Sequence, residues 1–203
     1  MTKKTVAAIP AGLFLIGALI AGNSATASAQ SLKDLTDVCA GCHGEAGIPM
    51  DKTVPVIWGQ KRLYILNQLW DFKYGRRKND MMTPIVDGLS KSDMESLATY
   101  FSEQKWPEIE QPAPSAEDVK TARGVLDTIN CDGCHQAQYE GDTQRPRLAG
   151  QNAEYLLKTM NDFRTDERKT YIGMTALLQS VHEETLKPVA EYLASLKVTE
   201  EKK

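Results

Sequence analysis

Two short motifs constrain this chain more than any other feature of its sequence. The first, CAGCH, begins at Cys39, and the second, CDGCH, begins at Cys131; together they contain all four cysteines of the 203-residue chain. Each motif places two thiols and an imidazole at positions i, i+3 and i+4, which share one face of a helix. The fold must therefore present two such faces.

The motifs belong to a longer internal repeat, which indicates a duplicated domain. Cys39 matches Cys131 at an offset of 92 residues, and PVIWGQ from Pro55 matches PRLAGQ from Pro146 at an offset of 91. Further matches follow through both halves: Tyr64 with Tyr155, Asp71 with Asp162, Phe72 with Phe163, Met82 with Met174, and Tyr100 with Tyr192. A one-residue insertion between Phe163 and Met174 explains the change of offset.

The boundary between the halves is a proline-rich segment. Residues 104–114 read QKWPEIEQPAP, with three prolines and no helical period, which is typical of a stiff linker. We therefore predict a first domain over residues 30–105, a linker over 106–114 and a second domain over 115–203.

The first 29 residues have the pattern of a secretory signal peptide. Lys3 and Lys4 precede an apolar run from Ala11 to Ala21, and the segment ends in small residues at Ala29. The run is shorter than a comfortable membrane span, which disfavours an uncleaved anchor. We expect cleavage after Ala29 and export to the periplasm, with no stable membrane span in the mature protein.

Both halves are predicted to be helical. Capping boxes at Ser31 and Ser115 each open a helix that runs into a cysteine motif, and a third at Ser90 opens another. Apolar residues recur at helical spacing over 61–73 and in the matching segment of the second half, 152–164. No alternating pattern of useful strand length is present. The sequence therefore predicts an all-α fold.

Three chemistries compete for the cysteines: structural disulfides, a zinc site, and covalent attachment of haem. The histidine after each pair decides among them, since the chain has only three histidines and two occupy this position. Zinc would need both motifs to share one ion across two domains. We expect two haem c groups, one on Cys39 and Cys42 and one on Cys131 and Cys134.

Methionine is the expected second ligand of each iron, opposite histidine. Met82 lies 39 residues after His43, and Met174 lies 39 residues after His135. Equal spacing in two halves that differ elsewhere indicates a shared task, and Met/His ligation is known in cytochromes c. Methionine is more often a core filler than a ligand, and the adjacent Met81 is a rival to Met82, but the repeat alignment favours Met82. We predict His43, Met82, His135 and Met174 as the iron ligands.

Two prolines fall at matching positions after the motifs. A ligating histidine usually donates its other ring N–H to a carbonyl or carboxylate, and the backbone carbonyls of Pro55 and Pro146 are candidates. A simple turn at each proline is the alternative. The third histidine, His182, matches Ser90 in the repeat and is expected at the surface or at a helix cap rather than on iron.

Residues 31–197 resemble the diheme cytochromes c of the c4 type. The resemblance rests on both Cys-x-x-Cys-His motifs, on Pro-x-x-x-Gly-Gln followed by Tyr-x-Leu in each half, and on MTPIVDGLS from Met82. It implies two tandem class I cytochrome c domains, each wrapped around one covalent haem, with methionine as the distal ligand. The chain departs from the family at Trp58, where Leu or Ala is more usual, and after Met174, where the Gly-Leu-Ser ending is missing.

An electron carrier is the function that the resemblance implies. Such proteins pass single electrons in the periplasm to redox partners, here expected to be a terminal oxidase, a cytochrome bc1 complex or a periplasmic dehydrogenase. The alternative is the diheme subunit of a dehydrogenase complex, such as a flavocytochrome c sulfide dehydrogenase. A six-coordinate iron has no place for substrate, so we predict no enzymatic activity for the chain itself.

Charge is unevenly shared between the halves. Residues 30–105 carry ten basic and ten acidic side chains, whereas residues 106–203 carry twelve basic and seventeen acidic ones. The lack of a basic stripe argues against nucleic-acid binding. A local basic cluster, RRK at residues 76–78, is either a docking site for an acidic partner or a solvated charge run.

Overall fold

The computed structural model describes residues 1–2 and 31–197, so the predicted signal peptide and its cleavage site lie almost wholly outside the described part. Residues 31–197 form helices and contain no strand, which confirms the all-α prediction. The helices follow one another as α1 (Leu32–His43), α2 (Arg62–Lys73), α3 (Met82–Asp87), α4 (Lys91–Glu103), α5 (Ala116–Thr128), α6 (Asp132–His135), α7 (Ala153–Arg164), α8 (Ile172–Gln179) and α9 (Glu183–Ser195).

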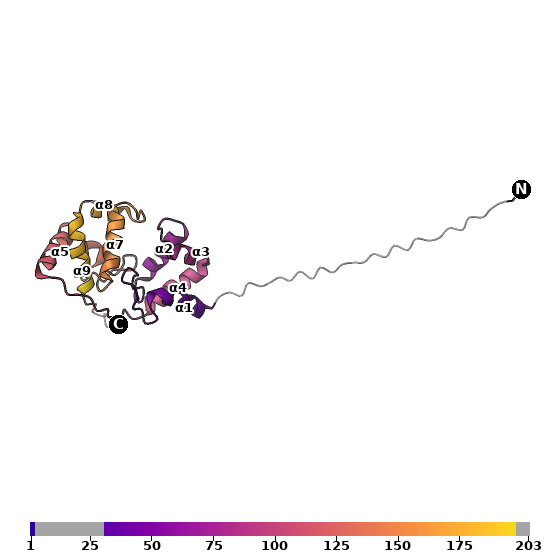
Figure 1. The fold of residues 1–203 in the computed structure, drawn as a ribbon, viewed down its shortest axis with the longest axis horizontal. Coiled ribbons are helices and arrows are strands. Elements are labelled where there is room, and N and C mark those ends of the chain that lie inside the picture. Colours follow the sequence, from indigo (N-terminus) through magenta and orange to yellow (C-terminus); the bar gives the residue numbers. More distant parts are fainter. Residues whose placement is uncertain (3–30, 198–203) are drawn as a thin grey trace.

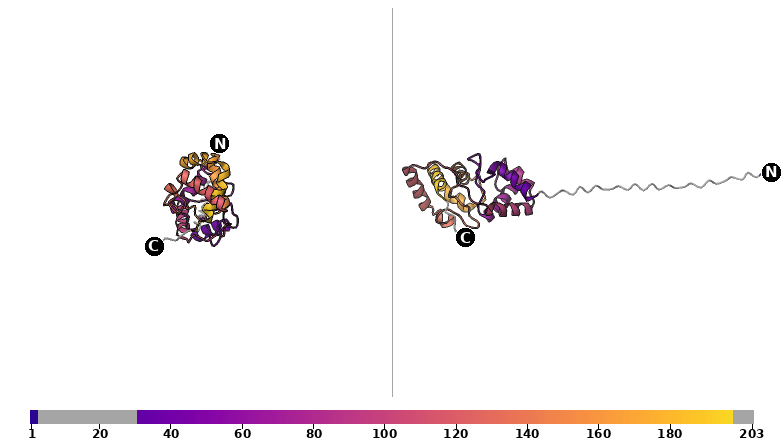
Figure 2. Two further views of the ribbon diagram at one scale, coloured as in Figure 1. Left: turned by 90° about the vertical axis from the view of Figure 1, so that its left-hand side faces the viewer. Right: turned by 90° about the horizontal axis from the view of Figure 1, so that it is seen from below.

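The helices form two lobes that share one plan, with α1–α4 in the first half and α5–α9 in the second (Figure 1). The first and last helices of each half pack together, α1 on α4 and α5 on α9. In the same way α2 contacts α3 and α4, and α7 contacts α8 and α9. The lobes stay side by side when the molecule is seen from below (Figure 2). The repeat in the sequence is thus a repeat of structure.

Each lobe has its own apolar core. In the first half, Met94, Leu97 and Phe101 of α4 are buried against α2 and α1. In the second half, Leu186, Val189 and Leu193 of α9 are buried in the same way. These positions follow the helical period that the sequence shows, because residues three and four apart share a face.

Two glutamines join the lobes in a reciprocal arrangement. The Gln60 amide donates to the backbone O of Arg147 at 3.0 Å and accepts from its N–H at 2.8 Å. The Gln151 amide does the same with Val56, at 2.9 and 2.8 Å. Both pairs stand at an offset of 91 in the repeat, so the contact is close to two-fold symmetric, like the interface of a homodimer.

The segment between α4 and α5 is docked on both lobes. Trp106 is buried, and its ring lies 5.0 Å from the Arg147 guanidinium carbon in the second half. Gly59 in the first half packs so closely on the Trp106 backbone that a side chain there would meet the Trp106 nitrogen at 2.9 Å. The prolines therefore lead the chain along the surface of both halves.

Candidate haem site

One cavity of about 1320 Å³ runs between the two lobes and reaches both cysteine motifs. Single small-molecule sites usually occupy about 300–1,000 Å³, so this space is large enough for more than one ligand. Every residue predicted to hold haem or iron lines it: Cys39, Cys42, His43, Met82, Cys131, Cys134, His135 and Met174. The fold thus gathers both predicted sets of residues in one place.

The two motif histidines are held alike. The Nδ1 atom of His43 lies 2.8 Å from the Pro55 carbonyl oxygen, and that of His135 lies 3.0 Å from the Pro146 carbonyl oxygen. Both rings are buried, and burial lowers the pKa of each imidazole, which favours the neutral form needed for ligation. With Nδ1 as the donor, Nε2 is left unprotonated and free to bind a metal. The expectation for the proline carbonyls is confirmed.

The cysteines are carried differently in the two halves. The first motif is the last part of α1, which runs unbroken through His43. In the second half, α5 ends at Thr128, Asn130 adopts a left-handed φ of 51°, and the motif forms the short helix α6. The prediction of a helix running into the motif is therefore right for the first half and wrong for the second. The two halves share only a helical conformation within the Cys-x-x-Cys-His motif itself.

Burial raises the pKa of the Cys39 and Cys131 thiols to about 11. Such thiols stay protonated near neutral pH in the absence of a metal or a covalent partner. Across the described residues, no group of three or more His, Cys, Asp or Glu side chains is placed to hold a metal ion.

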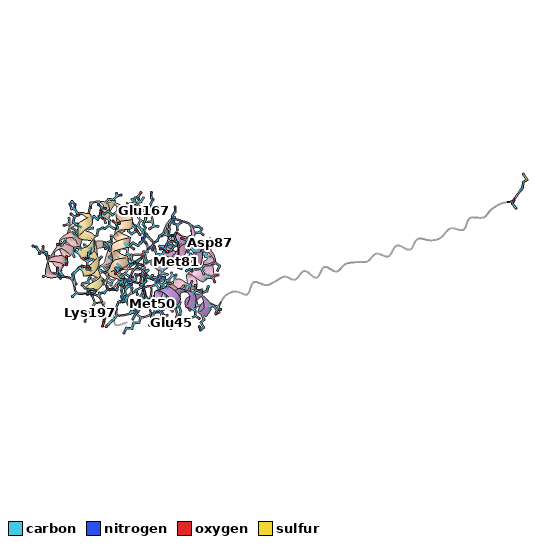
Figure 3. The ribbon with its side chains drawn as sticks, viewed as in Figure 1. Glu45, Met50, Met81, Asp87, Glu167 and Lys197 are labelled. Carbon is cyan, nitrogen blue, oxygen red and sulfur yellow. The ribbon has the colours of Figure 1, made fainter. Side chains whose placement is uncertain are left out.

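The adjacent methionines Met81 and Met82 differ in their surroundings. Met82 is the first residue of α3 and packs against the core of the first lobe, as Met174 in α8 packs against the core of the second. Met81 is 67% exposed and lies at the α3 end of the first lobe (Figure 3). Both methionines line the cavity and donate a backbone N–H to the Asn79 side chain, at 3.0 Å from Met81 and 2.9 Å from Met82, so they differ only in how they pack. This packing favours Met82 over its neighbour.

Comparison with known proteins agrees with this geometry. The family model described as "Cytochrome c" matches residues 119–197. A cytochrome c4 from Azotobacter vinelandii is 34% identical over 160 residues, which is 71% of this chain and 75% of that protein. This chain belongs to the cytochrome c4 family.

A solved structure and a second relative extend the comparison. The crystal structure of reduced recombinant cytochrome c4 from Pseudomonas stutzeri aligns with a TM-score of 0.72 at 27% identity, covering 83% of this chain and all of that one. A thiosulfate dehydrogenase electron acceptor from Stutzerimonas stutzeri is 31% identical over 169 residues, 78% of each chain. As a member of the cytochrome c4 family, the protein carries two covalent haem c groups and transfers electrons; it is not itself an enzyme.

Two arginines in this cytochrome c4 fit the charge of the cofactor. Each haem c has two carboxylates, and buried carboxylates need a cationic partner. Arg77 and Arg168 line the cavity, and neither forms an ion pair with a carboxylate of the described residues. Their guanidinium groups are therefore two of the cations that this cavity offers to haem carboxylates.

The sequence did not single out these arginines as a pair. Arg77 and Arg168 stand at an offset of 91, the same as Gln60 and Gln151, so the repeat alignment contains the signal. The sequence instead places Arg77 in the local basic cluster of residues 76–78. In the structure its guanidinium turns inward and donates to the Gln68 amide oxygen at 2.9 Å, so Arg77 takes no part in such a surface.

His182 lies at the N-terminal end of α9 with an exposed side chain and makes no capping hydrogen bond. Among the described residues, no helix is long and apolar enough to cross a membrane.

Proposed function

We propose that this cytochrome c4 is a periplasmic electron carrier whose two haems have histidine and methionine as axial ligands. His43 and Met82 would hold the first iron, and His135 and Met174 the second. The four cysteines would bond the vinyl groups of the two macrocycles. The haem supplies a one-electron Fe(III)/Fe(II) couple when it is bound.

One observation carries the ligand assignment. In both halves the motif histidine is fixed by a proline carbonyl and faces the same cavity as a methionine 39 residues further on. Thioether ligation raises the haem potential, and a filled sixth position leaves no site for substrate. The chain's residues would thus orient the haem, exclude water from the iron and stabilise the reduced state.

Location in the periplasm is supported by the signal-peptide pattern of the first 29 residues. The partners would be a donor such as a cytochrome bc1 complex or a periplasmic dehydrogenase, and an acceptor such as a terminal oxidase. The neutral first half and the acidic second half give the molecule an electrical polarity, which would orient it as it meets a charged partner.

A second candidate is a permanent subunit of a dehydrogenase complex. It is favoured by the likeness to a protein described as a thiosulfate dehydrogenase electron acceptor. In that case the chain would receive electrons within a stable complex, and its role would still be electron transfer.

Purification of the native protein with its haems separates the two candidates. A free carrier elutes alone, shows two one-electron steps in a redox titration, and is reduced by a purified donor at a rate that depends on donor concentration. Co-elution with a flavoprotein or another catalytic subunit in fixed ratio supports the subunit. Absence of two redox-active low-spin haems would contradict both candidates.

A further inference from the structure

The two inward-facing arginines, Arg77 and Arg168, each contact a side chain of the opposite lobe. Arg77 lies in the loop that leads to Met82, and its Nη2 donates to the Tyr155 hydroxyl of α7 at 3.2 Å. Arg168 lies in the loop that leads to Met174, and its Nη2 is 3.4 Å from the Tyr64 hydroxyl of α2. Each methionine loop thus reaches a tyrosine of the opposite half.

Each arginine is held in place by its own half. The Arg77 backbone N–H donates to the Asp71 carbonyl at 2.9 Å, and its guanidinium carbon lies 4.7 Å from the Phe72 ring centre. The matching contacts of Arg168 are made to Asp162 at 2.9 Å and Phe163 at 4.4 Å. These partners are equivalent in the repeat. The same local structure therefore directs each arginine toward the opposite half.

Gln68 breaks this symmetry. Its Oε1 accepts from Arg168 Nη2 at 2.6 Å and from Arg77 Nη1 at 2.9 Å. The matching residue of the second half is Thr159, which is too short to act in the same way. Arg168 consequently has two partners in the first half and is 3% exposed, whereas Arg77 has one partner in the second half and is half-buried.

We propose that Arg168 is a positioning residue that tunes the haem of the opposite half, so that the potential of the first haem depends on a charge supplied by the second domain. The inference rests on the proposed function, since it takes one haem in each half. Its basis is that Tyr64 and Gln68, the partners of Arg168, both belong to α2 and line the haem cavity.

The electrostatics of the cavity support this role. A cation held in a site with little water stabilises an added electron, because charges interact more strongly there than in bulk solvent. Burial opposes ionisation of both phenols, and the charges of Arg77 and Arg168 act against it. They lower the pKa of Tyr155, whereas at Tyr64 burial prevails and the pKa is raised. The guanidinium field thus reaches groups of both lobes.

Arg168→Gln in the full holoprotein tests the proposal. The potential of each haem is followed through its own paramagnetically shifted proton signals, assigned with Met82 and Met174 variants. Loss of the charge should lower the potential of the first haem, which lies in the half that does not contain residue 168. Arg123→Gln is the matched control. Arg123 also contacts a tyrosine hydroxyl, Tyr192 at 3.4 Å, but within the second half, so the first haem should not respond.

Arg168→Lys guards against misfolding of the glutamine variant. Lysine keeps the charge but cannot present the planar fork that reaches two acceptors, so it should produce a smaller shift in the same direction. A first-haem potential unchanged in both variants would overturn the proposal. That failure is distinct from failure of the proposed function, in which the unmodified protein would lack two low-spin haems with methionine ligands.

Discussion

The two lobes have the same fold but differ in residue size at one pair of equivalent positions. A large and a small residue, Trp58 and Gly47, correspond to Ala149 and Tyr139 in the second half. In the first half, the Trp58 ring packs directly on Gly47, where an added Cβ would come within 2.6 Å of it. In the second half the matching residues are Ala149 and Tyr139, joined by a hydrogen bond from Ala149 N–H to the Tyr139 carbonyl at 3.1 Å. Trp58, unusual for the family by sequence, is explained by the glycine that makes room for it.

The loop after each histidine shows a second difference. Gly44 follows His43 with φ +89°, and Gln136 follows His135 with φ +70° and ψ 162°. Glycine adopts such angles freely, whereas any other residue there is strained. The backbone after the motif histidine is therefore less strained in the first half than in the second.

Loss of one cysteine pair should have the largest effect. Cys39→Ala with Cys42→Ala should leave one covalent haem per chain, on the second half, and Cys131→Ala with Cys134→Ala should leave one on the first. The mass of the intact protein and its haem absorbance measure this directly. Two bound haems in either double variant would refute the assignment of one haem to each motif.

Gly47→Ala should destabilise the first half, because the new Cβ would clash with Trp58. Overpacking of this kind costs about 1–3 kcal/mol in the free energy of unfolding, measured by denaturant titration of the holoprotein. Gly75→Ala is the control: Gly75 has a similar φ of +67° but no neighbour within 4 Å, so it reports backbone strain alone. Equal losses in both variants would show that Trp58 exerts no steric constraint.

Gln60→Ala and Gln151→Ala should have similar effects, because each leaves one backbone N–H and one C=O of the opposite lobe without its partner. A buried unsatisfied group costs about 1–3 kcal/mol, which sets the scale of the loss in the same titration. A large effect of one variant and none of the other would show that the two-fold contact is symmetric in geometry but not in energy.

Gln136→Gly should stabilise the second half slightly. Its side chain is exposed, and the change relieves backbone strain of about 1 kcal/mol, the low end of the usual range. A small rise in the denaturant midpoint, with unchanged haem content, is the expected result. A fall would mean that the strain is smaller than the entropy that glycine adds to the unfolded chain, about 0.5–1 kcal/mol.

Features that depend on short motifs or on the internal repeat could be predicted from the sequence. The helices, the histidine–proline contacts and the choice of lining residues follow from short motifs and from the repeat. The break between α5 and α6 could not be predicted in this way, because it depends on a left-handed turn at Asn130. The inward turn of Arg77 depends on Tyr155 and Gln68, which only the docking of the lobes brings near. Long-range contacts of this kind leave no periodic pattern in the chain.

Axial ligation by Met82 and Met174 is the central claim, and the near-infrared band from thioether-to-iron charge transfer tests it most directly. In the oxidised protein, Met82→Ala should remove about half of the band, since one of two thioether ligands is lost. Met174→Ala should remove a similar share, the double variant should remove all of it, and Met81→Ala should leave it intact. A band that survives Met82→Ala but falls in Met81→Ala would contradict the account.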